Sequence, residues 1–304
     1  MKSRILALTL LLGLGSLGVT TQASADDATA LRSLNTLSIL LDKSSMAYQM
    51  FKLDTGNPLY SQTIDKTVQR IRTLHDDYQD AAAKAKQQKE LAAINKDVND
   101  YLKGLISNEH KIAEGGYEEY AVVGDMYSNK ADAQAAIKKL YAAIKANNGV
   151  EVEAAVQETR DLASELQTLS SAYIEQSASV AGNAFRAGGN KPLDQLAHEF
   201  SSKLAKFDLS SDKVIGLNAK VREVKNKWAF IENSLINFKQ NTVPFLIYRY
   251  ADTMVDDLLD IGQMYESRNE TQVKAPAIGG APLPAGIPPA AGGAPLPPGV
   301  PPAK

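Results

Sequence analysis

Residues 152–173, VEAAVQETRDLASELQTLSSAY, show which kind of fold this chain adopts. Apolar or small side chains recur in this stretch at alternating steps of three and four residues, with charged and amide side chains between them. That spacing places the apolar side chains on one face of an α-helix and the charged ones on the other. The stretch is therefore predicted to be an amphipathic helix with a buried apolar stripe. The stripe comprises Val152, Ala155, Thr159, Leu162, Leu166, Leu169 and Tyr173.

The same three-and-four spacing recurs in seven further segments of the chain. They are residues 34–51, 64–85, 91–105, 133–144, 192–207, 217–238 and 243–265. Strand-type alternation is nowhere sustained over a comparable length. The sequence therefore predicts an all-α fold of about eight helices, packed antiparallel as helical bundles. Between residues 113 and 129 the pattern is blurred, because Gly115, Gly116 and Gly124 interrupt it.

The eight segments fall into two sets of four of similar length, which suggests two consecutive four-helix bundles. The expected parts are a signal peptide (1–25), a first helical bundle (26–148), a second helical bundle (149–272) and a disordered tail rich in Pro, Gly and Ala (273–304). Two local matches are consistent with an internal duplication. LNTLS is echoed by LQTLS in the second set, and VNDYLKGLI occupies the place of VKNKWAFIE, which pairs Tyr101 with Trp228. Because apolar helices also resemble one another by chance, duplication stays an open alternative.

The first 25 residues have the three parts of a secretory signal peptide. Lys2 and Arg4 form a short positive region, ILALTLLLGLGSLGV is the apolar core, and the small residues before Asp26 form the cleavage site. The core is short and glycine-rich for a membrane anchor. We therefore expect cleavage near Ala25 and a soluble periplasmic or secreted protein, with retention of the leader as an anchor as the alternative. The GLGSLG in the leader matches a dinucleotide-binding spacing, but it lies in the segment expected to be removed.

From Val273 onward the composition changes completely. GGAPLPAGIPPAA (279–291) is followed by GGAPLPPGVPPAK (292–304), and ten of the 13 prolines lie after residue 275. Such a segment is expected to be an extended, largely disordered polyproline-II tail. It serves either as a spacer or as a docking segment for an aromatic groove on a partner or for the cell wall.

The composition limits the classes of function. With 44% apolar and 22% charged residues, the chain has the composition of a soluble globular protein. Its formal charge is −2, which becomes −4 when Lys2 and Arg4 are lost with the leader, so no basic excess favours nucleic acid as a partner. The absence of cysteine excludes disulfides, thiolate zinc sites, iron–sulfur clusters and cysteine nucleophiles.

Sequence motifs for catalysis or metal binding are not found. There is no zinc-protease motif, no serine nucleophile elbow and no phosphate-binding loop, so we expect no enzyme activity, no cofactor and no metal site. His75 falls on the apolar stripe between Ile71 and Tyr78 and is expected to be a core or boundary residue with a hydrogen-bond partner. Four carboxylates along the last helix are interpreted as a solvated face: Asp252, Asp256, Asp257 and Asp260.

Aromatic residues gather in the last two helical segments. Tryptophan and tyrosine bury large areas and need one polar contact each, so core packing is the first interpretation and a binding surface the second. The candidates for ligand or partner contact are Trp228, Phe245, Tyr248 and Arg249. The last three fall off the apolar stripe of their helix. Arginine can bind a carboxylate or oxyanion through its forked guanidinium group.

Two features of these helices are shared with a known family. The leucine–serine step of LNTLS and LQTLS, and a tryptophan ahead of the helix VPFLIYRYADTM, resemble the extracytoplasmic four-helix sensor domains of type IV pilus methyl-accepting chemoreceptors and of nitrate sensors. The resemblance spans residues 28–268 and implies two consecutive sensor-like bundles. Family members usually continue the step with glutamine and arginine, whereas Ser38 is followed here by Ile39 and Leu40. Anion recognition by an arginine at this step is therefore not implied.

We expect a periplasmic, non-enzymatic helical protein that binds a protein partner or a small ligand of the cell envelope and is linked to type IV pilus or chemosensory systems. We expect no nucleic-acid partner and no membrane-embedded segment after cleavage, and homo-oligomerisation stays open. The alternative is an envelope structural or assembly factor that docks through its Pro-rich tail.

Overall fold

The computed structural model of the chain describes residues 25–179, 191–209, 216–238, 240 and 242–273. These residues form nine α-helices and no strand, which confirms the all-α fold of about eight helices. The helices are α1 (Ala25–Leu53), α2 (Pro58–Thr73), α3 (His75–Lys84), α4 (Gln88–Ala113), α5 (Tyr120–Asn147), α6 (Ala154–Ala178), α7 (Leu193–Lys206), α8 (Leu217–Ile236) and α9 (Pro244–Val273). The expected leader up to residue 24 and the tail from residue 274 lie outside this range. In the part that the structure describes, no helix is long and apolar enough to cross a membrane.

Two helix boundaries differ from the prediction. The segment predicted as one helix over 64–85 is broken at Leu74, so that α2 and α3 follow each other as two helices. The segment 133–144 is the second half of a longer helix, because α5 begins at Tyr120 and runs through Gly124. A single interior glycine costs an α-helix only about 1 kcal/mol, which the buried face of α5 outweighs.

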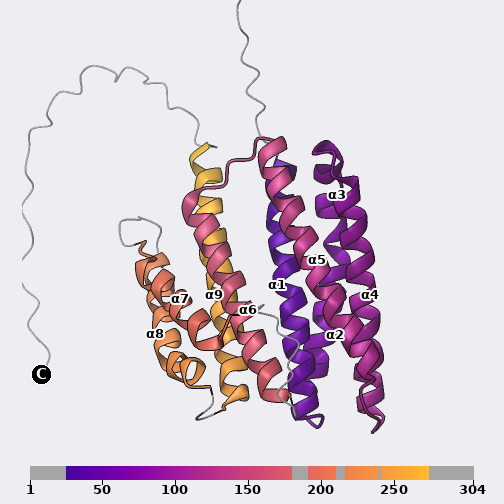
Figure 1. Cartoon of the computed structure of the whole chain (residues 1–304). Coiled ribbons are helices and arrows are strands. Elements are labelled where there is room, and N and C mark those ends of the chain that lie inside the picture. The colour runs from indigo at the N-terminus through magenta and orange to yellow at the C-terminus, as the bar shows by residue number, and fades with distance from the viewer. Residues whose placement is uncertain (1–24, 180–190, 210–215, 239, 241, 274–304) are drawn as a thin grey trace, which may run out of the picture.

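The helices form two sets (Figure 1). The first set contains α1, α2, α3, α4 and α5, and α2 and α3 together take the place of one long helix. The second set contains α6, α7, α8 and α9. In the first set, α4 packs along α5 and α1 contacts α2, α3 and α5. In the second set, α6 packs along α9, and α7 and α8 complete the group. The two sets meet where α1 lies against α6, and one continuous apolar core contains side chains of all nine described helices. The division into domains at residue 148 stays a prediction.

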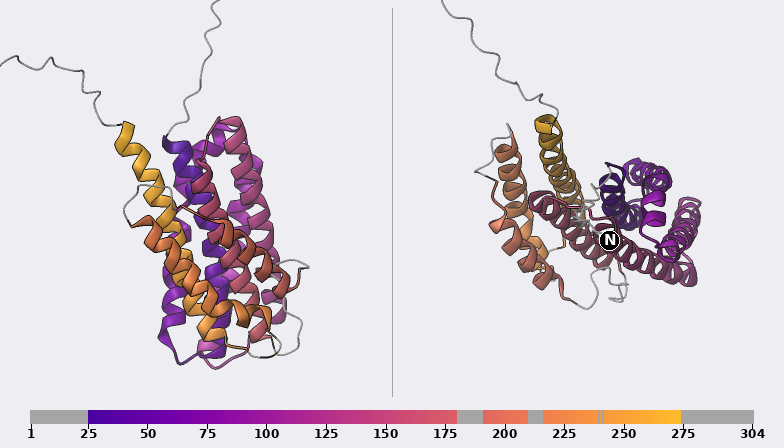
Figure 2. Two further views of the ribbon diagram at one scale, coloured as in Figure 1. Left: turned by 90° about the vertical axis from the view of Figure 1, so that its left-hand side faces the viewer. Right: turned by 90° about the horizontal axis from the view of Figure 1, so that it is seen from above.

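The two helices at this junction, α1 and α6, run in the same direction. Their hydrogen bonds join residues in ascending order on both helices, from Ser164 with Asn35 to Ser45 with Glu175. The start of α1 and the end of α9 consequently lie at one end of the molecule, and the turns after α1 and α4 lie at the opposite end (Figures 1 and 2). The first helices of the two sets thus face each other, an arrangement compatible with the duplication that stays open.

The start of α9 is marked by a proline. Pro244 is the first residue of the helix, where no backbone N–H is needed for an intrahelical bond. The N–H of Val243 donates to the hydroxyl of Tyr173 at 2.9 Å, and Ile247 is completely buried. Asn241, whose residue type favours a helix N-cap, lies outside the described residues.

Candidate functional site

Large apolar side chains are exposed at the end of the molecule that carries the turns after α1 and α4. Tyr117 and Tyr120 are 92% and 81% exposed, and Leu53, Leu59 and Phe245 are about half exposed. We call these five residues the loop end. In the described part of the chain they account for five of the six most exposed large apolar residues. Burying such side chains against a partner is favourable, so their exposure distinguishes this end from the rest of the surface.

The turn between α4 and α5, which carries Tyr117, is fixed to α1 by one glutamate. The carboxylate of Glu118 accepts a hydrogen bond from the hydroxyl of Tyr48 at 2.9 Å. It also forms an ion pair with the Nζ of Lys52 at 2.8 Å. On the other side, the backbone N–H of Glu119 donates to Asn108 Oδ1 at 3.1 Å, and Asn108 is completely buried. The exposed tyrosines therefore stand on a turn held by buried partners.

Leu59 and Phe245 reach the same end from α2 and α9. Their neighbours Tyr60 and Tyr248 make an edge-to-face contact with ring centroids 5.3 Å apart, which fixes the beginnings of the two helices side by side. Burial raises the pKa of Tyr248 to about 12. Leu53 is the last residue of α1, directly before the short turn into α2. The loop end therefore extends over three connections, which are α1 to α2, α4 to α5 and α8 to α9.

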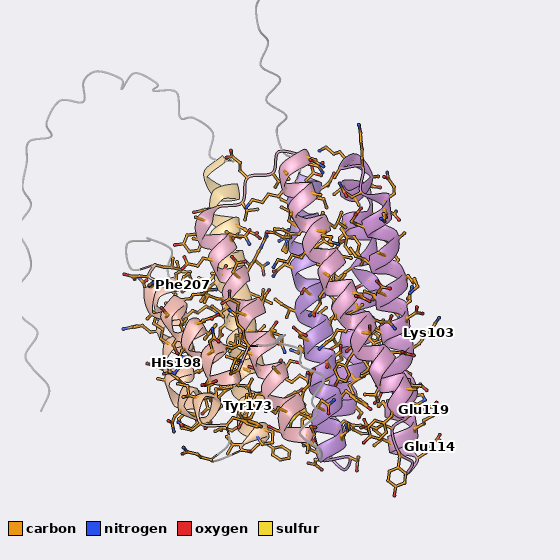
Figure 3. The ribbon with its side chains drawn as sticks, viewed as in Figure 1. Lys103, Glu114, Glu119, Tyr173, His198 and Phe207 are labelled. Atoms are coloured by element: carbon orange, nitrogen blue, oxygen red, sulfur yellow. The ribbon has the colours of Figure 1, made fainter. Side chains whose placement is uncertain are left out.

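The turn between α4 and α5 has an acidic excess of one charge over the lysines near it. Lys52 is paired with Glu118, and Lys111 with Glu119. Figure 3 shows Glu114 and Glu119 together at this end of the molecule. Three glutamates of this turn therefore have two lysines as partners. A protein partner with lysine or arginine around its contact patch would be attracted to this turn.

Replacing Glu118 by alanine is expected to release the turn without unfolding the bundle. The change removes two contacts to α1, each contributing on the order of 1 kcal/mol. Amide hydrogen exchange of residues 114–119 should become faster by about tenfold, while the core of α4 exchanges as before. The exposed Glu158→Ala serves as a control. Unchanged exchange in the turn would contradict the anchoring role of Glu118.

A second unusual feature is a buried group of three charges between α1, α5 and α6. The Nζ of Lys130 lies 3.1 Å from Asp42 Oδ1 and 3.2 Å from Glu175 Oε1. We call these residues the ionic triad. Thr168 donates to Asp42 Oδ2 at 2.9 Å and Ser45 to Glu175 Oε1 at 2.8 Å. The triad joins the two sets of helices at their junction.

The protonation of the triad is governed by burial. Burial alone would lower the pKa of Lys130, but the carboxylates of Glu175 and Asp42 outweigh it and raise that pKa above its ordinary value. Burial raises the pKa of Glu175, against the attraction of Lys130. Its second oxygen, Oε2, has no hydrogen-bond partner in the described part of the chain. Because all three side chains are buried, the triad holds helices together and offers no exposed group to a substrate.

The residues predicted from sequence as contact candidates fall into two groups. Trp228 is buried, donates from Nε1 to Ser201 at 2.8 Å and packs against Phe200, which is a core role. Tyr248 is also buried, and its predicted place off the apolar stripe is wrong. Phe245 is half exposed and belongs to the loop end, and Arg249 is exposed.

The remaining polar predictions have mixed outcomes. His75 lies at the boundary of the core, and its Nε2 is 3.0 Å from Asn95 Nδ2, which confirms the expected hydrogen-bond partner. The acidic residues of α9 are only partly a solvated face. Asp252 pairs with Lys43 of α1, and Asp257 pairs with Lys227 of α8 at 2.6 Å, so these carboxylates also connect neighbouring helices.

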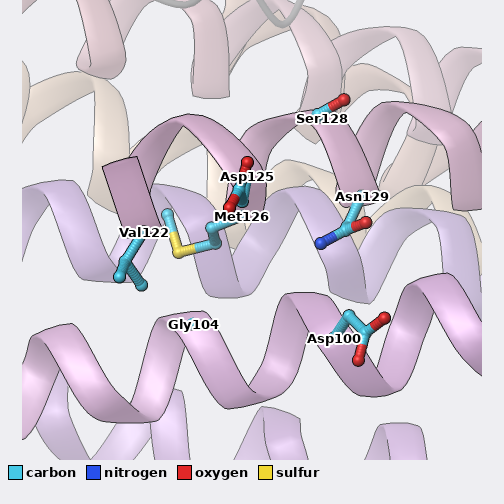
Figure 4. Close-up of a pocket in the computed structure, with 7 residues that line it drawn as sticks. All are labelled: Asp100, Gly104, Val122, Asp125, Met126, Ser128 and Asn129. Carbon is cyan, nitrogen blue, oxygen red and sulfur yellow. The ribbon is translucent and has the colours of Figure 1, made fainter. Parts of the chain in front are cut away.

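An open groove of about 420 Å³ lies between α4 and α5 (Figure 4). Its lining residues are Asp100, Gly104, Val122, Asp125, Met126, Ser128 and Asn129. Asp100 is already paired with Lys96 and Lys103 on its own helix. In the described ranges, no group of three histidine or carboxylate side chains is placed to hold a metal ion.

Two parts of this arrangement are not predicted from the sequence. Tyr117 and Tyr120 lie in the stretch whose helical pattern is blurred by glycines, so it indicates a turn but not what the turn exposes. The burial of Lys130 is not predicted either, because this residue lies between the blurred stretch and the segment predicted as a helix from residue 133. Continuing the stripe of α5 backward from Ala133 would have placed Lys130 and Tyr127 on the buried face.

Comparisons with protein families, with curated proteins and with solved structures give no match to this chain. The likeness to four-helix sensor domains therefore rests on the sequence features alone and stays a prediction. The fold and the loop end together define, in the part that the structure describes, an all-helical protein with exposed aromatic side chains at the end opposite to the start of α1 and the end of α9.

Proposed function

We propose that this is an extracytoplasmic, non-enzymatic binding protein that holds a protein partner on its loop end. The observation that carries the proposal is the exposure of five large apolar side chains at that end, on turns anchored by buried contacts. The extracytoplasmic location follows from the predicted leader, and a link to type IV pilus or chemosensory systems follows from the sequence resemblance.

The chemistry of the loop end fits a protein partner better than a small ligand. Tyrosines supply large contact areas at low conformational-entropy cost, which makes them common energetic centres of protein interfaces. The five residues come from three different connections and form an end surface, and they do not line an enclosed cavity. The acidic border favours a partner whose apolar patch is surrounded by lysine or arginine.

The position of the chain ends supports the same surface. The start of α1 and the end of α9 lie opposite the loop end (Figure 1). A leader retained in the membrane would therefore leave the loop end directed away from the membrane. A bundle built in this way presents its exposed tyrosines to other envelope proteins.

A photo-cross-linker placed at Tyr117 in living cells tests this function. We expect one dominant cross-linked protein, with no equivalent product from the same cross-linker at the exposed position Lys138. Equal, diffuse labelling from both positions would overturn the proposal. Cross-linking that disappears only when residues 275–304 are removed would instead support the alternative function of docking through the tail.

The double variant Tyr117→Ser/Tyr120→Ser is expected to weaken binding of the cross-linked partner by at least about tenfold, because truncating central interface aromatics typically costs more than about 1 kcal/mol each. Affinity measured by calorimetry on purified components checks this prediction. Both side chains are highly exposed, so the thermal unfolding midpoint should stay unchanged. The variant Phe230→Ser, which removes an exposed aromatic side chain of α8 outside the loop end, is the control.

A further inference from the structure

A second exposed aromatic surface lies on the outer face of α8 and α9, apart from the loop end. Phe230 of α8 is 58% exposed and lies against Tyr250 of α9, with ring centroids 4.9 Å apart and planes inclined by 35°. We call these two residues the aromatic pair. In the described part of the chain, the hydroxyl of Tyr250 makes no hydrogen bond. The exposed amide of Asn233 lies about one helical turn further along α8.

Such a surface has the chemistry that recognises polyproline-II segments. A polyproline-II helix has no internal hydrogen bonds, so its carbonyl groups accept bonds from tyrosine hydroxyls and amides. Its proline rings pack against flat aromatic side chains at little cost in conformational entropy. Two neighbouring aromatic rings, a hydroxyl without a partner and a nearby amide supply both kinds of contact.

We propose that the chain's own Pro-rich tail docks on the aromatic pair. The tail continues directly from α9, the helix that carries Tyr250, and contains two consecutive copies of a proline-rich 13-residue unit. It has no charged residue between Lys274 and Lys304, so the contact is apolar and hydrogen-bonded rather than ionic. This inference concerns a different surface from the loop end and does not depend on the proposed partner.

The tail is long enough to return to the aromatic pair. Tyr250 lies 23 residues before the end of α9, which corresponds to about 35 Å along the helix. At about 3.1 Å per residue, a tail that turns back at once reaches Tyr250 near about residue 285. A tail that turns back at Gly279 and Gly280 reaches it near about residue 298. The segment that docks therefore lies between the middle of the first unit and the middle of the second.

Tethering favours the intramolecular contact over the same contact between two molecules. A segment linked to its site through a short flexible connection has an effective concentration in the millimolar range. Even a weak proline–aromatic contact is then substantially occupied. A docked tail lies along α9 and is withdrawn from other proline-binding partners of the envelope.

Spin-label distance measurements on the full chain test the proposal. Because the chain has no cysteine, Asn226→Cys on α8 and Ala294→Cys in the tail give two specific labelling sites. We expect a narrow population of short distances between the labels. In the background of Phe230→Ser this population should be lost and replaced by a broad distribution. Phe245→Ser, which removes an equally exposed phenylalanine from the loop end, should leave it unchanged.

Three results would overturn the proposal. The first is a broad distribution in the otherwise unchanged chain, which shows that the tail does not dock. The second is a narrow population lost in Phe245→Ser but kept in Phe230→Ser, which places the tail on the loop end. The third is its loss on dilution with excess unlabelled chain, which shows docking between molecules. Thermal unfolding of each variant verifies that the fold is intact.

Discussion

Replacing Lys130 by methionine is expected to lower the free energy of unfolding at pH 7 by about 3 to 5 kcal/mol. The change leaves the carboxylates of Asp42 and Glu175 buried without their cation, at the junction between α1 and α6. Methionine retains most of the apolar volume of lysine, so the loss measures the charge and not a cavity. Chemical denaturation followed by circular dichroism gives the free energy. Lys138→Met, an exposed lysine of the same helix, should change it by less than about 0.5 kcal/mol.

The loss in Lys130→Met is expected to shrink as the pH falls. Burial raises the pKa of Glu175 in the folded state, and removal of Lys130 raises it further. A carboxyl group with a raised folded-state pKa is stabilising while protonated and loses that contribution as the pH rises through the folded-state value. The difference between the variant and the unchanged chain should therefore be smaller at pH 5 than at pH 7.5. A difference independent of pH would show that Glu175 takes up no proton in the folded variant, and that the loss of Lys130 does not raise its pKa into this range.

The triple variant Asp42→Leu/Lys130→Met/Glu175→Leu tests how much the charges of the ionic triad contribute to the free energy of unfolding. Replacing a complete buried ion group by apolar side chains of similar size is often neutral or stabilising. We expect the triple variant to be at least as stable as Lys130→Met alone. A triple variant much less stable than Lys130→Met would show that the serine and threonine partners of the carboxylates contribute more than the charges do.

The fold class was predictable because helical periodicity is local. Each stripe of apolar residues records which face of one helix is buried, and the helices appear where the stripes are. The break at Leu74 was not predictable from this signal, since Leu74 is itself fully buried and the apolar spacing continues from α2 into α3. The apolar spacing indicates which side chains are buried. Here the buried side chains continue across the point where α2 ends and α3 begins.

The position of a helix among its neighbours was not predictable. The sequence pattern of α9 shows one stripe through Ile247 and Met254, which places Tyr248 outside it. In the structure α9 contacts α6, α8 and α1, and it meets Tyr60 of α2, so Tyr248 and Val255 are buried as well. A helix at the junction of two sets has a wider buried face than the pattern of a single bundle predicts. The same reasoning explains why the binding candidates reduce to Phe245 and Arg249.

Introducing a methyl group at Gly262 is expected to destabilise the second set of helices by about 1 to 3 kcal/mol. A Cβ atom at this position of α9 would lie 2.7 Å from the Oγ1 of Thr159 on α6, closer than Cβ atoms approach non-bonded neighbours. Thr159 is completely buried and its hydroxyl donates to the carbonyl of Val156 at 2.8 Å, so it has no free space to enter. The overlap outweighs the gain of about 0.5 to 1 kcal/mol that alanine brings to a helix interior.

A double-mutant cycle identifies Thr159 as the cause of that loss. In Gly262→Ala/Thr159→Ala the obstructing oxygen is gone, so the alanine at 262 should cost less than it does beside threonine, with a favourable coupling of about 1 kcal/mol. Gly262→Ala/Thr159→Val is the matched control, because valine keeps an atom in the place of Oγ1 and should give no rescue. The comparison needs the unfolding free energies of six proteins, which are the unchanged chain, the three single variants and the two double variants. Additive effects of Gly262→Ala and Thr159→Ala would show that α6 and α9 separate to accommodate the methyl group, and that their close packing at this crossing is not rigid.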